Sequence, residues 1–555
     1  MKKNFLSLIK FLIFSIAFAQ NYPQNYFRYP LEIDQILAGS FAELRGFHFH
    51  SGIDIKTQQR EGQKVFAVAE GYISRISVSP SGYGNALYIT HPNGYTSVYA
   101  HLQKFQDEIG KYVTAQQNQQ KSFEINIFPP AEALPVNKGE FIALTGNSGS
   151  SGGPHLHFEI RDTETEETIN PFLFGLTTPD HKNPLLNGMY IYAITGDVEG
   201  KKRYDLTGAK DFKSPVLASG TIGVGVKAYD KMDFAENLDG IYSIEMWVNN
   251  QKYFTYEVDR FSFSQTRMIN CQTDYEQYMN NKSFIYKLFL EEGNSLTMVK
   301  KAENNGYINL IPNQDYQIKV VLKDFAGNQT KGSFTVRGKE NSQPQILNKN
   351  GKFLKWNEEN HYDDENVSLY FPAKSFYQDL YLKVDKIGEN YFIQNDRVPL
   401  HKFYTLAIKP KNLSPAQLQN AVIAVTYNYG NKKVKDYFET TYQDGKLIAQ
   451  VRDFGQFTIE FDREKPIISP INVSPNTSFI KGSKLKFKVK DSSSGIKSYN
   501  AFANNEWVIL RYDKKNHLMW IDREDILFTG KAELSIQIQD LGGNLAKKNY
   551  SINLK

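Results

Sequence analysis

The sequence predicts a mostly β protein that is built from several modules. The chain has 34 tyrosines and 38 phenylalanines among 555 residues, an abundance of aromatic residues that is typical of β-rich folds. At about 150 residues per domain, this length corresponds to three to five domains rather than one core. We therefore expect a small N-terminal antiparallel β-sheet domain with a short helical insertion. About three β-sandwich, Ig-like modules should follow it.

The N-terminal domain is expected over residues 20–176, because short β runs alternate there with glycine turns. The tetrapeptide Pro92-Asn93-Gly94-Tyr95 is a tight-turn signal, and it should join residues 87–89 and 96–99 as a hairpin. Examples of the predicted β runs are residues 64–69, 72–78, 86–90, which includes the first strand of this hairpin, and 141–145.

An insertion interrupts this pattern at residues 104–135. Phe105, Ile109, Tyr112 and Val113 have helical spacing, whereas residues 122–128 alternate like a strand. The insertion could form a wall of a substrate groove or only decorate an edge of the sheet, and the sequence does not decide between these alternatives.

Beyond Pro179 the sequence indicates tandem β-sandwiches. The segment Asp324-Phe325-Ala326-Gly327-Asn328 is echoed by Asp540-Leu541-Gly542-Gly543-Asn544, which suggests two related Ig-like modules. They are predicted at residues 177–340 and 464–555, with a different β module at 341–463. The two Asp-x-x-Gly-Asn segments could bind calcium, but a strand-joining turn explains them without an ion, and we favour that interpretation.

The N-terminus has the pattern of a secretory signal peptide over residues 1–19. Lys2, Lys3 and Lys10 form a basic region, an apolar stretch follows, and Ala17-Phe18-Ala19 is a small-x-small cleavage site. A membrane anchor is the alternative, but the apolar stretch is shorter than the ~20 residues that a bilayer requires. We expect an exported protein of the periplasm or cell envelope, with secretion as the alternative, and no transmembrane segment in the mature chain.

Composition narrows the classes of partner. Cys271 is the only cysteine, which excludes an intramolecular disulfide framework and a lipid-modified N-terminal cysteine. The net charge of +5 is small for this length; it permits attraction to an anionic polymer such as a cell wall. The chain has no dense basic run or recognised nucleic-acid motif, so nucleic acid is not an expected partner.

Histidines concentrate near the N-terminus, where six of the ten occur at or before residue 157. Strand alternation places His155, His157 and Glu159 on one face of a strand, with apolar residues on the other. It likewise places His48 and His50 on a common face. Imidazoles on a cleft-facing surface, together with Asp54, form a donor set that suits zinc. No H-E-x-x-H helix is present, so histidine would have to serve as the general base.

These residues belong to three blocks that occur in a characteristic order. They are Arg45-Gly46-Phe47-His48-Phe49-His50-Ser51-Gly52-Ile53-Asp54, then Gly82-Tyr83-Gly84-Asn85 to Tyr99-Ala100-His101-Leu102, then Thr145-Gly146-Asn147-Ser148-Gly149 to Gly153-Pro154-His155-Leu156-His157-Phe158-Glu159. Together they resemble the lysostaphin- or LytM-type zinc metalloendopeptidases, the M-twenty-three family of peptidoglycan hydrolases. The resemblance covers about a quarter of the chain.

The resemblance implies a role for each matching residue. The H-x-x-x-D motif makes His50 and Asp54 zinc ligands, and the H-x-H motif adds His157 as the third ligand. His101 and His155 would be catalytic, with the division of roles between them open. The family implies one Zn²⁺ per peptidase domain and a small, mostly antiparallel β structure with an open groove. The implied substrates are the peptide stems and cross-links of bacterial peptidoglycan.

Three further residues near these motifs have alternative interpretations. His48 could replace His50 as a ligand, although the family spacing selects His50 and leaves His48 a supporting or neutral role. Glu159 could orient a zinc ligand or could be a solvated carboxylate. His91 precedes the predicted turn and is expected to be a surface residue.

The sequence predicts an exported zinc endopeptidase, and two other functions are alternatives to it. The chain could be a catalytically silent protein that binds the wall or regulates a hydrolase, or it could be a secreted zinc endopeptidase acting on other proteins. Silent relatives typically lose zinc ligands, whereas this chain retains all five site residues. The C-terminal β modules could bind a cell-envelope protein partner. Because every motif residue lies within residues 20–176, we expect this segment to be a self-sufficient catalytic core.

Overall fold

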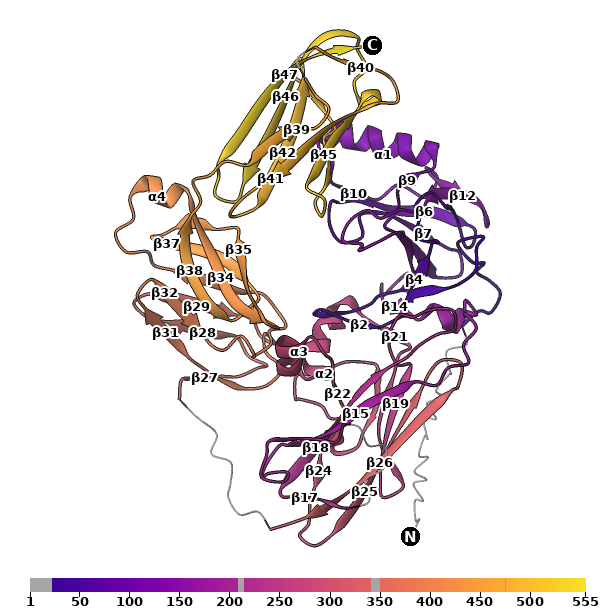
Figure 1. Ribbon diagram of the computed structural model, residues 1–555, viewed down its shortest axis with the longest axis vertical. Helices are drawn as coiled ribbons and strands as arrows, with labels where there is room; N and C mark the ends of the chain where they lie inside the picture. The colour runs from indigo at the N-terminus through magenta and orange to yellow at the C-terminus, as the bar shows by residue number, and fades with distance from the viewer. Residues whose placement is uncertain (1–21, 208–213, 341–349, 475) are drawn as a thin grey trace, which may run out of the picture.

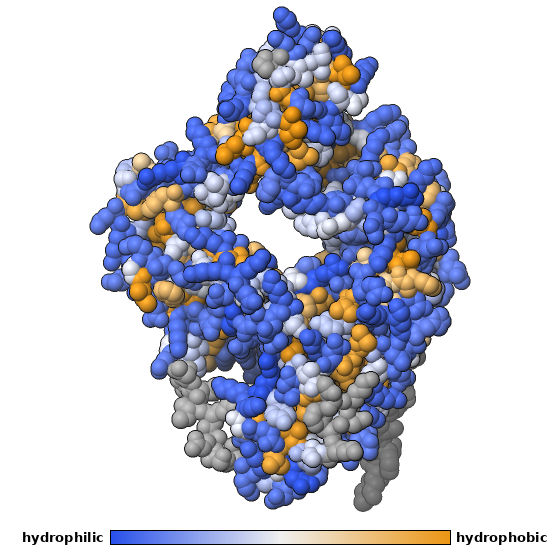
Figure 2. Space-filling model, viewed as in Figure 1, coloured by the Kyte–Doolittle hydropathy of each residue, from blue (hydrophilic) through white to orange (hydrophobic). Residues whose placement is uncertain are grey.

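The computed structural model describes residues 22–207, 214–340, 350–474 and 476–555. The predicted signal peptide, residues 1–19, lies outside these ranges. The described chain is mostly β, as predicted, and its parts follow one another around a ring (Figure 1). An opening passes through the middle of this ring in the space-filling view (Figure 2). Among the described residues, no helix is long and apolar enough to cross a membrane.

The N-terminal domain is built on a ten-stranded sheet whose central order is β1-β4-β13-β8-β7-β6-β10. Neighbouring strands in this order are antiparallel, as predicted. Their bounds are β1 (Leu37–Gly39), β4 (Ile53–Lys56), β13 (His155–Asp162), β8 (Tyr95–Ala100), β7 (Asn85–Thr90), β6 (Gly71–Val78) and β10 (Ile125–Ile127). Strands β11 (Pro135–Val136), β14 (Thr168–Ile169) and β21 (Arg260–Phe261) join it at the sides. Buried Leu156, Phe158 and Ile160 of β13 face the core of this domain.

The predicted hairpin is confirmed, with β7 and β8 paired from Leu87 opposite Tyr99 to Thr90 opposite Thr96. The prediction for His91 is wrong in part. This residue does flank the turn, but it is buried, with Nδ1 bonded to the Glu70 carbonyl at 2.7 Å and Nε2 to Ser97 Oγ at 2.8 Å. The imidazole can be buried because each of its ring nitrogens has a hydrogen-bond partner.

A second sheet combines β5 (Lys64–Phe66), β12 (Phe141–Leu144) and β9 (Lys104–Phe105). The insertion contributes to both sheets and contains helix α1 (Asp107–Gln120). Ile109 and Val113 are buried on the inner face of α1, whereas Phe105 belongs to β9 rather than to the helix. The helix begins at Asp107 because the side chain of Gln106 accepts bonds from the first free backbone amides.

The insertion contacts the C-terminal module. Tyr499 donates a hydrogen bond to Glu124 at 2.9 Å, and the Phe123 side chain packs against the core of that module. Strand β10 of the insertion is the last strand in the order of the ten-stranded sheet. The insertion therefore lies at that edge, and its contacts with the C-terminal module help to close the ring.

The range predicted for the first module, residues 177–340, shares a continuous core with the N-terminal domain. Strand β21 pairs with β14, so that Phe261 lies opposite Thr168. The ring of Phe261 packs against Phe41 and Phe49, with centroid distances of 5.5 and 5.7 Å. This junction also includes helix η2 (Phe263–Met268), α2 (Ile269–Gln272) and α3 (Tyr275–Asn281).

The first and last modules have the same strand order. Five strands of one sheet share this order: β17-β26-β25-β19-β20 in the first and β40-β47-β46-β42-β43 in the last. In the first module a sixth strand, β23 (Val299–Ala302), extends the sheet beyond β20. In both, the first pair is parallel and the others are antiparallel. The bounds are β17 (Val216–Ala218), β26 (Gln329–Gly338), β25 (Asp315–Lys323), β19 (Ser243–Val248) and β20 (Gln251–Glu257), against β40 (Thr477–Phe479), β47 (Leu545–Leu554), β46 (Gly530–Asp540), β42 (Ile496–Ala503) and β43 (Glu506–Val508).

The facing sheets of these modules also correspond. The first contains β15 (Leu185–Ala193), β18 (Thr221–Tyr229) and β22 (Tyr286–Lys287), and the last contains β39 (Ile467–Pro470), β41 (Lys484–Lys490), β45 (Leu518–Asp522) and β44 (Arg511–Asp513). The recurrence seen in the sequence is thus a recurrence of topology.

The middle module has a different arrangement, with two five-stranded sheets around a separate core. Their orders are β28-β29-β33-β37-β36 and β31-β32-β38-β34-β35. The bounds are β28 (Asn360–Asp363), β29 (Val367–Phe371), β33 (Tyr404–Ile408), β37 (Lys446–Val451), β36 (Thr441–Gln443), β31 (Val384–Ile387), β32 (Asn390–Ile393), β38 (Gly455–Phe461), β34 (Ala421–Tyr429) and β35 (Lys432–Phe438).

Candidate active site

Two neighbouring strands position the centre of the site. In the antiparallel pair β4–β13, Asp54 lies directly opposite His157. On the other side of β13, His157 lies opposite Ala100, so His101 follows at the end of β8. Opposite residues of adjacent strands have side chains on the same face. The pairing register therefore brings together residues that are 103 positions apart in the sequence.

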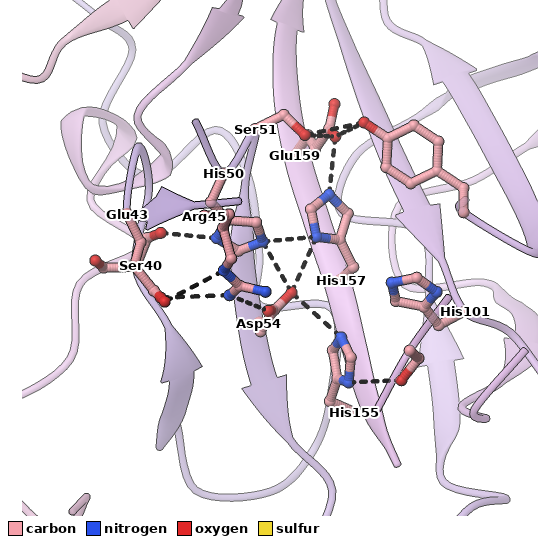
Figure 3. Close-up of polar contacts among 12 residues, drawn as sticks. Ser40, Glu43, Arg45, His50, Ser51, Asp54, His101, His155, His157 and Glu159 are labelled. Carbon is pink, nitrogen blue, oxygen red and sulfur yellow. Dashed lines mark hydrogen bonds and ion pairs between the residues drawn. The ribbon is translucent and has the colours of Figure 1, made fainter. Parts of the chain in front are cut away.

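His50, Asp54 and His157 form a compact triangle of ligand atoms (Figure 3). His50 Nε2 lies 3.1 Å from Asp54 Oδ1 and 3.0 Å from His157 Nδ1. The third side, from His157 Nδ1 to Asp54 Oδ1, is 2.9 Å. All three residues are buried, and none is more than 5% exposed. Two imidazole nitrogens and one carboxylate oxygen form a donor set that suits zinc.

The remaining polar atom of each of these side chains has its own partner (Figure 3). His50 Nδ1 bonds to the Ser40 carbonyl at 2.7 Å, and His157 Nε2 bonds to Glu159 Oε1 at 2.8 Å. Because these acceptors take the N–H of each neutral imidazole, the nitrogen of each ring in the triangle can offer its lone pair to a metal cation. Arg45 Nη2 donates to Asp54 Oδ2 at 2.9 Å, which leaves Oδ1 in the triangle.

Glu159 is the centre of a buried network behind His157. Its side chain is completely buried, and it accepts bonds from Ser51 Oγ at 2.6 Å and the Tyr83 hydroxyl at 2.5 Å. Arg161 Nε donates to its other oxygen at 2.6 Å. The structure therefore resolves the sequence alternatives for Glu159: it orients His157 and is not a solvated carboxylate.

Electrostatics at the triangle favour a cation. Burial alone would raise the pKa of Asp54, but the facing histidines keep this pKa well below its usual range. Burial also acts to lower the pKa of His157, yet its bonds to Asp54 and Glu159 raise the value to about 9. The two carboxylates thus create a negative potential at His157 Nδ1, where either a proton or a metal cation would be stabilised.

His101 and His155 flank the triangle, and their ring centroids are 4.8 Å apart. His155 Nε2 is 3.3 Å from Asp54 Oδ1, and its Nδ1 bonds to the Gly153 carbonyl at 2.9 Å. His101 Nδ1 bonds to the Ser148 carbonyl at 2.9 Å. His101 therefore carries its proton on Nδ1, which leaves Nε2 as a proton acceptor, whereas both ring nitrogens of His155 face oxygen acceptors. Burial, together with the charge of the neighbouring histidines, lowers the pKa of His101 to about 3, so it is neutral near pH 7.

His48 does not join this group. The predicted alternation over residues 47–50 is interrupted, because Phe47 has φ +65° and β3 (His48–Phe49) is only two residues long. His48 is exposed and bonds to the Gly46 carbonyl, whereas His50 is buried.

Several residues that the sequence reasoning missed support the site. Arg161 is the next member of the alternating series that contains His155, His157 and Glu159, so extending that series by one step would have found it. Arg45, Ser51 and Tyr83 all lie within the three quoted motif blocks. Their partners depend on contacts between distant segments, for which the strand pattern gives no signal.

Comparison with known proteins relates two segments of the chain to protein families. Residues 48–118 match the model of Peptidase family M23, and residues 351–462 match that of the Zu5-like domain. The chain is 35% identical over 137 residues to the DD-carboxypeptidase/endopeptidase Mpg of Neisseria meningitidis, which is 25% of each protein. It is 30% identical over 176 residues to an uncharacterized metalloprotease of Haemophilus influenzae, covering 29% of this chain and 31% of that one. The similarity thus spans between a quarter and a third of these curated relatives.

Among solved structures, the catalytic domain of lysostaphin from Staphylococcus simulans is 21% identical and covers 25% of this chain and 92% of that chain, with a TM-score of 0.19. The match to the family model begins at His48 and includes His50, Asp54 and His101. The two curated relatives described above are named for peptidase activity. The N-terminal domain of this chain is thus similar to peptidase family M23, whose model it matches over residues 48–118.

Proposed function

We propose that the chain is an exported zinc-dependent endopeptidase that hydrolyses the peptide cross-links of bacterial peptidoglycan. The triangle of His50, Asp54 and His157 supports this proposal most strongly, because its three ligand atoms lie 2.9–3.1 Å apart. A catalytic zinc site has three protein ligands and one open position, and these residues supply that number. They would hold one zinc ion per domain.

The supporting bonds fit this metal. Each ligand side chain is held by a second partner, as is usual around zinc, where such partners fix ring orientation and tautomer. Zinc bound to these three atoms would polarise the scissile carbonyl and lower the pKa of a water molecule to about 7.

His101 and His155 would carry the proton transfers. In both residues Nδ1 is bonded to a backbone carbonyl; Nε2 of His101 is free within the described chain, and Nε2 of His155 lies 3.3 Å from Asp54 Oδ1. One Nε2 accepts the proton of the attacking water as its oxygen bonds to the carbonyl carbon. The resulting imidazolium nitrogen donates that proton to the amine that leaves when the peptide bond breaks. To donate a hydrogen bond to the carbonyl oxygen as its negative charge develops, the other histidine would carry a proton on Nε2. The 3.3 Å approach of His155 Nε2 to Asp54 Oδ1 favours that state for His155.

The choice of substrate and location rests on the relatives and the predicted signal peptide. One relative is named a DD-carboxypeptidase/endopeptidase. The prefix DD refers to cleavage between two D-amino acids. The lipoprotein NlpD of Yersinia enterocolitica is 29% identical over 117 residues, covering 20% of this chain and 90% of that protein. An exported enzyme would meet such bonds in the cell envelope.

Mass spectrometry of the fragments released from isolated peptidoglycan tests the proposal. Residues 20–555 should reduce the amount of cross-linked species, a chelator should stop the reaction, and added zinc should restore it. Cross-linked species that persist with a folded, zinc-loaded protein would contradict the proposed substrate. Cleavage of casein in the same preparation would instead support an endopeptidase that acts on other proteins.

Two variants test the catalytic pair. His101→Ala and His155→Ala should each retain zinc but lose roughly 10²–10⁴-fold in rate, the usual contribution of a positioned acid or base. His361→Ala, at an exposed histidine of β28, is the matched control and should behave as the unmodified chain. Full activity in both site variants would exclude these roles.

A further inference from the structure

The first and last modules each bring three aspartates together. The two groups are Asp180, Asp230 and Asp324 in the first module, and Asp462, Asp491 and Asp540 in the last. Within each group, one carboxylate oxygen of every member lies within 4.8 Å of the others. We call these groups the first and second aspartate clusters.

The clusters occupy equivalent positions in the shared topology. Asp180 and Asp462 lie in the segments that enter their modules. Asp230 directly follows β18, as Asp491 directly follows its counterpart β41. Asp324 directly follows β25, and Asp540 is the last residue of its counterpart β46. Three acidic positions are thus repeated in two modules that otherwise differ in sequence.

The surrounding hydrogen bonds are repeated as well. In the first cluster, Asn328 donates from its backbone to Asp324 Oδ1 at 2.8 Å and from its side chain to the Asp180 carbonyl at 3.3 Å. In the second, Asn544 donates to Asp540 Oδ1 at 2.8 Å and to the Asp462 carbonyl at 2.9 Å. The strand-joining turn that the sequence suggested therefore exists, and it also fixes the carboxylates.

In the first cluster, Asp230 has a buried carboxylate oxygen without a polar partner among the described residues. The residue is only 2% exposed, and its Oδ1 has no hydrogen-bond partner among the described residues. The nearby Lys182 ammonium donates to the Met232 carbonyl instead, and Lys231 pairs with Glu236. A buried carboxylate without a compensating charge is costly. In the second cluster, Asp491 Oδ1 is likewise unpartnered within the described chain.

We propose that each aspartate cluster binds one calcium ion. Carboxylate and carbonyl oxygens are the ligands that calcium prefers, and its flexible coordination accommodates irregular groups of them. The clusters contain no imidazole or thiolate, which separates them from the zinc chemistry of the N-terminal domain. Each ion would offset the mutual repulsion of three carboxylates.

The ions would also stiffen the joints of the ring. Asp180 belongs to the segment that leaves the N-terminal domain, and the ring of Phe172 in that domain packs 5.3 Å from Phe325 beside the first cluster. At the second cluster, Asn420 of the middle module donates to the Gly542 carbonyl at 3.0 Å. Calcium at these positions would link each entering segment to the module that it enters.

Calorimetric titration of calcium into zinc-loaded residues 20–555 tests the proposal. We expect two calcium ions per chain, one after Asp324→Asn, one after Asp540→Asn, and none in the double variant. Asp363→Asn, at an exposed position of β28, is the control and should retain both. An absence of binding up to about 10 mM calcium, above the ~10⁻³ M dissociation constants of weak extracellular sites, would overturn the proposal. Unchanged stoichiometry in the variants would also overturn it.

A thermal measurement separates loss of a site from loss of folding. Above pH 8 and without calcium, Asp230→Asn should unfold at a higher temperature than the unmodified chain. Burial raises the pKa of Asp230 to about 8, so above that pH the variant removes a buried charge. Saturating calcium should raise the unfolding temperature of the unmodified chain by about 5 °C or more. It should raise that of Asp230→Asn by less, because only the second cluster remains in that variant. An equal response of both proteins to calcium would contradict a site at the first cluster.

Discussion

Glu159 illustrates how one buried carboxylate can order a metal site. It accepts a bond from His157 Nε2, while Ser51, Tyr83 and Arg161 fix its own position. Burial alone would raise the pKa of Glu159, but Arg161 and His157 lower it well below its usual range. The carboxylate is therefore ionised at neutral pH, and it holds His157 in the tautomer that leaves Nδ1 free.

Replacement of Glu159 by glutamine should weaken metal binding without removing a ligand. An amide is a poorer acceptor for His157 and does not neutralise Arg161, so zinc affinity should fall about 10–100-fold. Competition with a fluorescent zinc chelator measures this change. Glu166→Gln, at an exposed turn, is the control, and an affinity for Glu159→Gln equal to that of the control would contradict the role of Glu159.

For single residues, the sequence predicts the candidate metal ligands better than it predicts the residues that hydrogen-bond to those ligands. Alternation along β13 correctly places His155, His157 and Glu159 on one face, because that strand is regular over eight residues. It fails around His48, where the left-handed backbone of Phe47 ends the regular strand. The partnership between Arg45 and Asp54 depends on how separate segments pack, and no local pattern encodes that.

At the scale of elements, the turn between β7 and β8 buries a neutral histidine. Burial lowers the pKa of His91 from 6.5 to about 4, against the opposing bond to the Glu70 carbonyl. The unfolded chain therefore binds a proton below about pH 6.5 that the folded chain binds only near pH 4. This group contributes no pH dependence above pH 6.5 and destabilises the fold progressively as the pH falls toward 4.

Replacement of His91 by glutamine should flatten this dependence. The unmodified chain should lose about 3 kcal/mol more stability than His91→Gln between pH 7 and pH 4, since each pKa unit corresponds to 1.36 kcal/mol. Hydrogen exchange of the β7 and β8 amides measures the difference. Parallel pH profiles for the two proteins would show that His91 does not titrate as a buried neutral group.

The pairing of β14 with β21 changes the expectation for a minimal catalytic fragment. The sequence suggested that residues 20–176 suffice, because they contain every motif. The structure instead packs Phe261 of the first module against Phe41 and Phe49. A fragment ending at residue 176 would expose these two rings and leave the outer edge of β14 unpaired.

We therefore expect residues 20–340 to unfold cooperatively and at a higher temperature than residues 20–176. Burial of a phenylalanine side chain contributes about 1.5–3 kcal/mol, so two exposed rings represent a large loss for a small domain. Scanning calorimetry of the two fragments provides the comparison. Equal unfolding temperatures would restore the expectation of a self-sufficient segment.

At the scale of the whole molecule, all three C-terminal modules contact the surroundings of the site. The Phe47 ring lies 5.6 Å from Tyr278 of the first module and 6.4 Å from Tyr429 of the middle module. Lys515 of the last module donates to Asn147 Oδ1 and to the Ser151 carbonyl, each at 2.8 Å. The loop that Lys515 contacts leads directly into His155, and the ring is closed at this point (Figure 1).

Lys515→Ala should release this loop and open the site to large substrates. We expect faster cleavage of intact peptidoglycan and an unchanged rate on a short cross-linked peptide, which needs less space. Lys514→Ala, at the neighbouring exposed lysine, is the control. Equal rates for the two variants on both substrates would show that the contact does not restrict access.

The ring itself could not be predicted from the sequence. The strand pattern indicated β modules and the repeated Asp-x-x-Gly-Asn segments indicated a repeated topology, because both are local signals. Closure of the ring depends on single contacts such as that between Tyr499 and Glu124, 375 positions apart. Such contacts are determined by how the modules pack together and have no periodic signature.

Native mass spectrometry of zinc occupancy tests the central claim most directly. The unmodified residues 20–555 should carry one zinc ion. This ion should be lost in His157→Ala and retained in the control His361→Ala. None of the three proteins has a substitution in the aspartate clusters. This result would place zinc at the triangle of His50, Asp54 and His157. One zinc ion retained in a folded His157→Ala protein would contradict the assignment of these residues as its ligands.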